Sequence, residues 1–282
     1  MTIGIIGLGL IGGSLAKAFK KHTDHRVLGY DRDKAITQYA QLTDTIDGVV
    51  DAASIAQCEL ILLAVYPRAT VAYLSEMAGK IAPGTVVIDC GGIKRSICEQ
   101  CRPLAKEHGW IFIGGHPMAG LHHSGIKYAN ADLYAGASMI LTPENTENIA
   151  LLEKVTGWIK SIGFASVTVT TPEKHDEIIA FTSQLAHVVS NAYVKSPRAK
   201  VHRGFSAGSY RDLTRVARLN ETMWAELFLE NRENLVAEIE HIVRSLKEYQ
   251  TALEQGDAET LKALLKDGSD RKERIDSPYG ED

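Results

Sequence analysis

Residues 7–12 of the chain read Gly7-Leu8-Gly9-Leu10-Ile11-Gly12. A short apolar run, residues 2–6, precedes this stretch, and a helical pattern over residues 11–21 follows it. A Gly-x-Gly-x-x-Gly turn between a strand and a helix is typical of dinucleotide-binding folds. The first glycine permits the tight turn, the second lets the backbone approach a pyrophosphate, and the third lets the helix pack closely on the strand. The stretch therefore predicts a Rossmann-type cofactor domain.

The next predicted strand, residues 26–30, ends at Asp31, 22 positions after Gly9. A carboxylate at this strand end can accept hydrogen bonds from the ribose hydroxyls and would repel a 2′-phosphate, which favours NAD over NADP. Arg32 leaves NADP open, because an arginine there can accommodate that phosphate. FAD uses the same fingerprint, but we see no further glycine motif for a flavin domain. The helix N-terminus binds phosphate through free N–H groups, so the expected cofactor contacts are Gly7, Gly9, Leu10, Ile11, Gly12, Asp31 and Arg32.

Strand and helix signals alternate through the first half of the chain. Such alternation predicts an α/β domain with a mostly parallel sheet. Besides the two strands above, we expect strands at 60–65, 85–89, 110–113, 138–141 and 167–169, and helices at 69–80 and 95–107. From Pro172 onward the periodicity is helical. We therefore expect a dinucleotide-binding domain over residues 1–165 and an all-α domain over residues 166–282.

Two long helices are expected in this second half. Residues 174–195 are apolar around most of the helix, which predicts a central, buried helix. Residues 221–255 carry apolar side chains at steps of three and four, which resembles a heptad seam. This seam suits either an internal bundle or a dimer contact, and we favour a homodimer formed through the C-terminal helices. The tail from Asp267 has mixed charge and is expected to be a solvated end.

Composition narrows the class of protein. The chain has 282 residues, is 45% hydrophobic and carries a formal net charge of −4. These values exclude a mainly disordered chain, and we expect neither nucleic-acid binding nor a membrane span. The N-terminus is a poor signal peptide, so we expect a cytoplasmic protein. Cys98 and Cys101 form a CxxC without a second ligand pair, so we expect reduced thiols and no metal site.

His116 is the strongest candidate for chemistry. It lies in Gly114-Gly115-His116-Pro117-Met118-Ala119-Gly120, just after the expected strand at 110–113. Ligands bind at the carboxyl ends of strands in open α/β sheets. A histidine fixed at that position can act as a general base near neutral pH.

Polar residues on the helical half suggest a substrate pocket. Ser183, Gln184 and His187 share a face of the expected buried helix, because they lie three and four residues apart. Arg211 and Arg215 are also four apart, and arginine geometry matches carboxylates. A core histidine and a solvated basic helix face remain open as structural alternatives.

These motifs together resemble the prephenate dehydrogenase family, which includes the arogenate and cyclohexadienyl dehydrogenases of tyrosine biosynthesis. The similarity rests on GLGLIGGSLA, GGHPMAG, the SxLxH helix, and YRDLTRVA followed by MW, in that order along nearly the whole chain. It implies a Rossmann domain followed by a helical dimerisation domain, and NAD-dependent oxidative decarboxylation of prephenate to 4-hydroxyphenylpyruvate. Some members also carry a C-terminal regulatory ACT domain, and we expect none here because the chain ends too soon for one.

The resemblance assigns roles to individual residues. It implies that His116 is the catalytic histidine, that His187 lines the substrate pocket, and that Arg215 binds a substrate carboxylate. By the same resemblance, Asp212 and Trp224 lie in or near the pocket. Gln184, on the same helix as His187, is a further candidate for substrate binding.

Two positions depart from the family pattern. Gly92 stands where many members have a serine that orients the catalytic histidine, and Gln184 and Ala186 stand in a helix that often reads SHLPH. These departures keep two alternatives open, an arogenate dehydrogenase and a non-catalytic NAD-sensing protein. A similar domain architecture leaves a third, a β-hydroxyacid oxidoreductase. Lys174 is the nearest candidate for the lysine of the third alternative, but its neighbours do not suggest that role.

Overall fold

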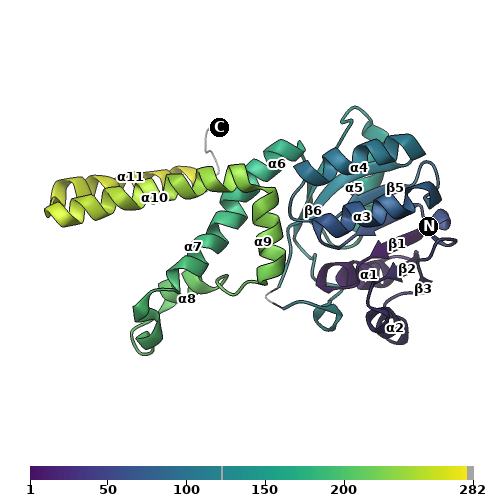
Figure 1. Ribbon diagram of the computed structural model, residues 1–282, viewed down its shortest axis with the longest axis horizontal. Helices are drawn as coiled ribbons and strands as arrows, with labels where there is room; N and C mark the ends of the chain where they lie inside the picture. The colour runs from purple at the N-terminus through teal and green to yellow at the C-terminus, as the bar shows by residue number, and fades with distance from the viewer. Residues whose placement is uncertain (122, 278–282) are drawn as a thin grey trace. The chain divides into compact units, whose positions relative to one another are not determined.

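The computed structural model describes residues 1–121 and 123–277 and contains an eight-stranded sheet of order β3-β2-β1-β4-β5-β6-β7-β8 (Figure 1). The strands are β1 (Thr2–Ile6), β2 (Arg26–Tyr30), β3 (Gly48–Val49), β4 (Leu60–Leu63), β5 (Val86–Asp89), β6 (Ile111–Pro117), β7 (Ser138–Pro143) and β8 (Ser166–Val169). All neighbours pair in parallel except β6 and β7. The first six strands have the strand order of a dinucleotide-binding sheet, with the crevice between β1 and β4. The predicted α/β class is confirmed.

The central strands β1, β4 and β5 are buried on both faces, which explains why they are almost wholly apolar. Leu60 and Leu62 of β4 belong to one core, and Ile61 and Leu63 belong to the other. Successive side chains of a strand point to opposite faces, so one strand supplies both cores. The first core also contains residues of α1 (Leu10–His22) and α5 (Ile149–Ser161), and the second contains residues of α3 (Pro67–Met77) and α4 (Arg95–His108).

Two helices of the first half, α5 and α2 (Lys34–Leu42), are not singled out by the sequence. Helix α2 buries only Thr37 and Ala40, so its apolar stripe is narrow. Its start is fixed by the Asp33 side chain, which accepts a hydrogen bond from the backbone N–H of Ala35 at 2.9 Å. Such a cap stabilises a helix start without contributing to hydrophobic periodicity.

The helical half begins with α6 (Pro172–Ile179), a π-helical turn (Ala180–Leu185) and α7 (Ala186–Tyr193). The expectation of a central, buried helix here holds only in part for the single chain, because Ile179 and Leu185 are buried but Phe181 is 61% exposed. The apolar residues surround the helix, but the single chain covers only part of its circumference. Helices α8 (Gly208–Thr214) and α9 (Glu221–Glu230) follow.

Asn231 divides the helix that the sequence predicts over residues 221–255. Its side chain is buried and donates to the backbone oxygen of Asp176 at 2.8 Å and to Oε1 of Gln184 at 2.9 Å. Its backbone leaves helical geometry, with φ −114° and ψ 27°. Helix α10 (Arg232–Gln255) then begins directly. A heptad pattern cannot reveal this break, because both halves keep their apolar spacing.

The chain forms two compact units, Met1–Arg232 and a second that begins at Glu233. The second unit is a helical hairpin of α10 and α11 (Ala258–Asp276), in which the Tyr249 hydroxyl donates to the backbone oxygen of Leu264 at 3.2 Å. The region from Asp267 is exposed, but it continues α11 to Asp276 and is therefore not an irregular tail. In the described ranges, no helix is long and apolar enough to cross a bilayer.

Strand β6 packs so closely on its surroundings that two of its positions have no room for a side chain. A Cβ atom at Gly114 would lie 2.2 Å from Oγ1 of Thr142, and one at Gly115 would lie 2.5 Å from the backbone oxygen of Asp89. The contact at Gly115 is with backbone, so it cannot relax without movement of β5, whereas the contact at Gly114 is with buried side chains that would have to move. The two glycines therefore fix the spacing of β6 against β5 and β7.

This packing predicts opposite effects for two Gly→Ala variants. Gly115→Ala should lower the free energy of unfolding by about 1–3 kcal/mol, because it overpacks the sheet. Gly157→Ala should raise it by about 0.5–1 kcal/mol, because Gly157 lies within α5 and a Cβ there meets nothing within 4 Å. Urea denaturation measures both changes. Equal stability of Gly115→Ala and the wild-type protein would contradict the packing account.

Candidate active site

The glycine turn after β1 has the geometry that a dinucleotide requires. Gly7 has φ +87°, and a Cβ at Gly12 would lie 1.8 Å from the backbone oxygen of Gly7. A Cβ at Gly9 would meet nothing within 4 Å, so the space in front of the turn is open. No side chain caps the N-terminus of α1 at Leu10 and Ile11. An open backbone at an uncapped helix start fits a pyrophosphate.

Asp31 is held at the carboxyl end of β2 by this same turn. Its Oδ2 accepts from the backbone N–H of Leu8, and its Oδ1 accepts from that of Asp33, each at 2.9 Å. The two contacts fix the carboxylate beside the glycine turn, where the fingerprint expects a ribose. Arg32 is exposed next to it. The assignment of both residues to the cofactor remains a prediction.

A buried ion pair lies at the carboxyl end of β5. Asp89 and Lys94 contact each other through Oδ2 and Nζ, and both side chains are fully buried. Asp89 also accepts from the backbone N–H groups of Gly91 at 2.9 Å and Gly115 at 3.1 Å. These donors compensate the carboxylate for its lost water. The pair joins the loop after β5 to β6.

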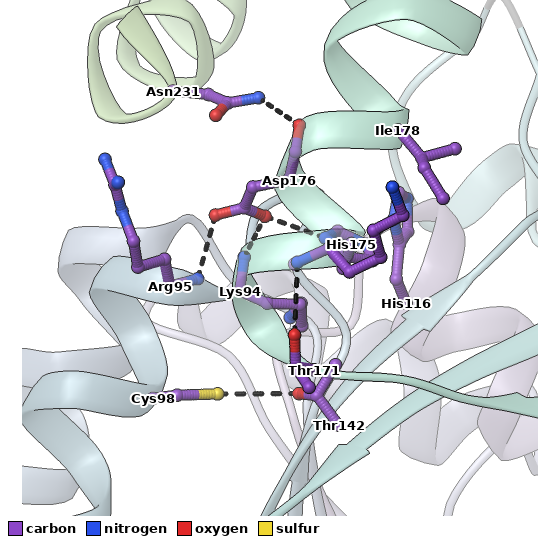
Figure 2. A network of polar contacts seen from close by, with 12 residues as sticks. Lys94, Arg95, Cys98, His116, Thr142, Thr171, His175, Asp176, Ile178 and Asn231 are labelled. Carbon is purple, nitrogen blue, oxygen red and sulfur yellow. Dashed lines mark hydrogen bonds and ion pairs between the residues drawn. The ribbon is translucent and has the colours of Figure 1, made fainter. Parts of the chain in front are cut away.

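His116 lies on β6 itself, opposite Ile140 of β7. The expectation that the strand ends at residue 113 is therefore wrong, since the Gly-Gly-His-Pro segment continues the antiparallel pairing to Pro117. Nδ1 of His116 lies 2.8 Å from Nε2 of His175, with the two ring planes inclined by 60°, and Figure 2 shows both histidines in one group of side chains. Nε2 of His116 lies on the side of Gly92, 4.0 Å from where a Cβ of that residue would be.

Asp176 anchors the second histidine to the start of α4, as Figure 2 shows. Nδ1 of His175 contacts Oδ1 of Asp176 at 2.7 Å. The same carboxylate accepts from the backbone N–H groups of Lys94 at 2.7 Å and Arg95 at 2.9 Å. An anion at a helix N-terminus is stabilised by the unpaired N–H groups and the helix dipole.

The surroundings disfavour the charged form of both imidazoles. The pKa of His116 lies well below its usual value of 6.5, mainly because the ring is buried, and also because His175 and Lys94 disfavour a second positive charge. Burial likewise lowers the pKa of His175, although Asp176 opposes that shift. His116 is therefore a neutral imidazole near pH 7, as a general base must be.

A second group of predicted residues gathers around His187. Its Nδ1 lies 2.8 Å from the backbone oxygen of Ser183, and its ring centroid lies 4.0 Å from that of Trp224. Burial lowers the pKa of His187, and the charge of Arg215 lowers it further. Leu227 is three residues after Trp224 on α9, and its side chain lies beside Gly92. Helix α9 thus joins this group to the region of His116.

Two other predicted substrate residues are placed differently. Gln184 is 1% exposed, with its amide bonded to the backbone oxygen of Leu227 at 3.3 Å and to Asn231 at 2.9 Å. Its polar atoms therefore serve internal contacts. Asp212 is exposed, and its carboxylate lies 3.7 Å from Arg211. Contact of either residue with substrate remains a prediction.

Sequence reasoning missed His175 and Asp176. They stand in Glu173-Lys174-His175-Asp176-Glu177, a charged run typical of a solvated helix start. A weak signal is the pair His175 and Ile179, buried four residues apart on α6. Only the pairing of α6 with the start of α4 distinguishes His175 from a surface histidine.

Comparisons with known proteins agree with this arrangement. A family model described as "Prephenate dehydrogenase, nucleotide-binding domain" matches residues 15–168, and one described as "Prephenate dehydrogenase, dimerization domain" matches residues 171–267. A relative from Zymomonas mobilis named cyclohexadienyl dehydrogenase is 31% identical, and the match covers 92% of this chain and 90% of the relative.

Two solved structures share the fold along the whole chain. The prephenate dehydrogenase from A. aeolicus, solved in complex with hydroxyphenyl propionate and NAD+, is 28% identical, with a TM-score of 0.82 and 98% of each chain covered. The arogenate dehydrogenase from Synechocystis is 25% identical, with a TM-score of 0.81, covering 98% of this chain and all of that one. The resemblance first seen in short motifs thus extends to both halves of the protein, and the chain belongs to the prephenate dehydrogenase family.

Proposed function

We propose that this protein catalyses the NAD-dependent oxidative decarboxylation of prephenate to 4-hydroxyphenylpyruvate and CO₂. The observation that carries the proposal is a neutral, half-buried His116 at the carboxyl ends of the strands, the same edge of the sheet that carries the dinucleotide turn. A general base beside a nicotinamide site is what oxidation of an alcohol requires. The similarity to the prephenate dehydrogenase from A. aeolicus supports prephenate as the substrate.

The residues of the glycine turn fit the cofactor. The N–H groups at the start of α1, including those of Leu10 and Ile11, would bind the pyrophosphate, and Gly9 leaves it room. Asp31 would accept from the adenosine ribose, which supports NAD over NADP. When bound, the nicotinamide supplies the hydride acceptor. Arg32 is near enough in sequence to contact the same ribose.

His116 performs the proton transfers in this mechanism. Nδ1 is engaged by His175, so Nε2 takes the proton of the hydroxyl on the substrate ring. At the same time the hydride leaves the carbon that bears this hydroxyl. That carbon becomes a carbonyl, and the bond from the ring to its carboxylate then breaks. The electron pair of this bond makes the ring aromatic and leaves a phenolate, and CO₂ departs. His116 returns its proton to the phenolate oxygen, which restores the neutral imidazole.

The group around His187 supports a binding site for the rest of the substrate. Prephenate carries two carboxylates, and the guanidinium of Arg215 matches one of them in charge and geometry. His187 donates from Nδ1 to Ser183, which leaves Nε2 for a substrate contact. Trp224 packs on this ring and restricts its orientation.

Arogenate is the second candidate substrate. It has the same ring chemistry and carries an amino group in place of the side-chain ketone. The similarity to an arogenate dehydrogenase from Synechocystis favours this alternative specifically. The proposed mechanism at His116 is unchanged, because the two substrates differ only away from the reacting ring.

We also propose a homodimer formed through α10. Val236, Val243, Leu246 and Leu253 are exposed on this helix at steps of seven, three and seven. A row of exposed apolar side chains with heptad spacing is typical of a helix that packs on a partner. The match of residues 171–267 to a dimerization-domain family supports a second copy of this chain as that partner.

Purified protein should reduce NAD with prephenate, seen as absorbance of the reduced nicotinamide. We expect kcat/KM for prephenate to exceed that for arogenate when the two are measured side by side, as the similarity to the prephenate dehydrogenase from A. aeolicus suggests. Faster turnover of arogenate would overturn the substrate but keep the reaction class. Folded protein that reduces neither NAD nor NADP with either substrate would overturn the enzymatic proposal.

His116→Asn should lower kcat by roughly 10²–10⁴-fold, the usual contribution of a general base. Its affinity for NAD, measured by titration calorimetry, should change little, because the glycine turn is separate from His116. His22→Asn is the matched control, since His22 is an exposed histidine at the end of α1. Near-normal turnover of His116→Asn would mean that another group is the base.

The double variant Leu246→Glu/Leu253→Glu should convert the dimer to a monomer, because it places charges in the proposed apolar contact. Light scattering after gel filtration measures the mass. Lys247→Glu, which introduces the same charge at an exposed neighbouring position, should leave the dimer intact. An unchanged mass of the double variant would exclude α10 as the contact.

A further inference from the structure

The mechanism above names His175 only as the group that engages Nδ1 of His116, and it gives Asp176 no role. We infer that His175 is a positioning residue, which, together with Asp176, holds His116 in the tautomer whose Nε2 carries no proton. This inference rests on the proposed function, because it concerns how the base is made ready. It follows from assigning donors and acceptors along a chain of three side chains.

The assignment begins at Asp176. Its Oδ1 accepts the backbone N–H of Lys94, and its Oδ2 accepts the backbone N–H of Arg95. Backbone amides can only donate, so both oxygens act as acceptors. The contact of 2.7 Å between Oδ1 and Nδ1 of His175 must then be donated by the histidine. Nδ1 of His175 therefore carries a proton.

The second step passes through the ring of His175. A neutral imidazole has one N–H, so its other nitrogen is an acceptor. Burial favours the neutral form of this histidine. Nε2 of His175 is thus an acceptor, and it lies 2.8 Å from Nδ1 of His116. His116 must donate from Nδ1, and its single proton is then accounted for. Nε2 of His116 is left as a bare lone pair.

No alternative group fixes this orientation. Among the described residues, His175 is the one hydrogen-bond partner of the His116 ring. On the opposite side stands Gly92, which has no side chain to donate or accept. A hydroxyl at position 92 would orient the His116 ring from the Nε2 side. In this protein the orienting contact is instead made at Nδ1, by His175 of α6.

The hydrogen bonds that link Asp176, His175 and His116 also matter after proton transfer. When Nε2 of His116 takes the hydroxyl proton, the ring becomes a cation in a buried site. The Nδ1–H of that cation still donates to His175, which is polarised by the carboxylate of Asp176. A hydrogen bond to a charged donor is stronger than one between neutral groups. His175 thus stabilises the protonated base as well as orienting the neutral one.

Kinetics of three variants test the positioning role. His175→Phe keeps a planar ring but removes the acceptor, so kcat should fall by roughly 10²–10⁴-fold, the range seen when a group that orients a functional histidine is lost. KM for prephenate and for NAD should stay within about twofold. His175→Gln should restore part of kcat, because its amide can accept from His116 and donate to Asp176. His22→Phe, at an exposed histidine, should match the wild-type protein.

¹⁵N NMR of labelled histidines measures the tautomer directly, with the His116 signals assigned by their loss in His116→Asn. The wild-type protein near pH 7 should show Nε2 of His116 as an unprotonated nitrogen and Nδ1 as a protonated one. His175→Phe should give a mixture of tautomers. A protonated Nε2 in the wild-type protein overturns the inference without any variant, even if His175→Phe does not fold.

Two other outcomes also overturn it: unchanged kcat in folded His175→Phe, or a lower kcat with an unchanged tautomer and no recovery in His175→Gln. The second outcome would make His175 merely structural. Failure of the proposed function is separate, because it would show as absent turnover in the wild-type protein. The NMR measurement does not depend on turnover.

Discussion

The carboxylate of Asp176 is the contact on which the arrangement of the site depends. It accepts the first backbone N–H groups of α4, which places α6 against the sheet edge. His175, the preceding residue, is thereby carried to His116 on β6. The backbone oxygen of Asp176 receives the amide of Asn231, where α9 ends and α10 begins. Loss of this carboxylate would leave buried donors unsatisfied, at a cost of about 1–3 kcal/mol each.

His116, the proposed base, needs surroundings that keep its imidazole neutral. Burial provides most of that effect, and the buried cation of Lys94 adds to it. Lys94 is itself held by Asp89, whose carboxylate also receives the N–H of Gly115, one residue before His116. Removing one partner of such a buried pair destabilises a protein by about 3–5 kcal/mol. The ion pair therefore serves both the electrostatics of the base and the attachment of β6.

The fold of the first half could be predicted because each element leaves a local signal. Strands β1, β4 and β5 are apolar runs, since both of their faces are buried, and the glycine turn fits one backbone geometry. Helix α2 was not predicted, because its two buried residues are too few to produce a helical period of apolar side chains. The break at Asn231 escaped because its cause is a hydrogen bond to residue 176, which spacing along the chain cannot show.

The sequence by itself determined the glycine turn and the α/β class, and it singled out His116 as a candidate, because short-range steric rules and motifs encode them. Tertiary structure alone decided that His116 lies within a strand and that its partner is His175, 59 residues away. It also decided that Gln184 bonds to Asn231, within the protein interior. A hydrogen bond between distant residues depends on the packing of whole elements. The charged run that contains His175 therefore does not reveal that this side chain will be buried near the start of α4.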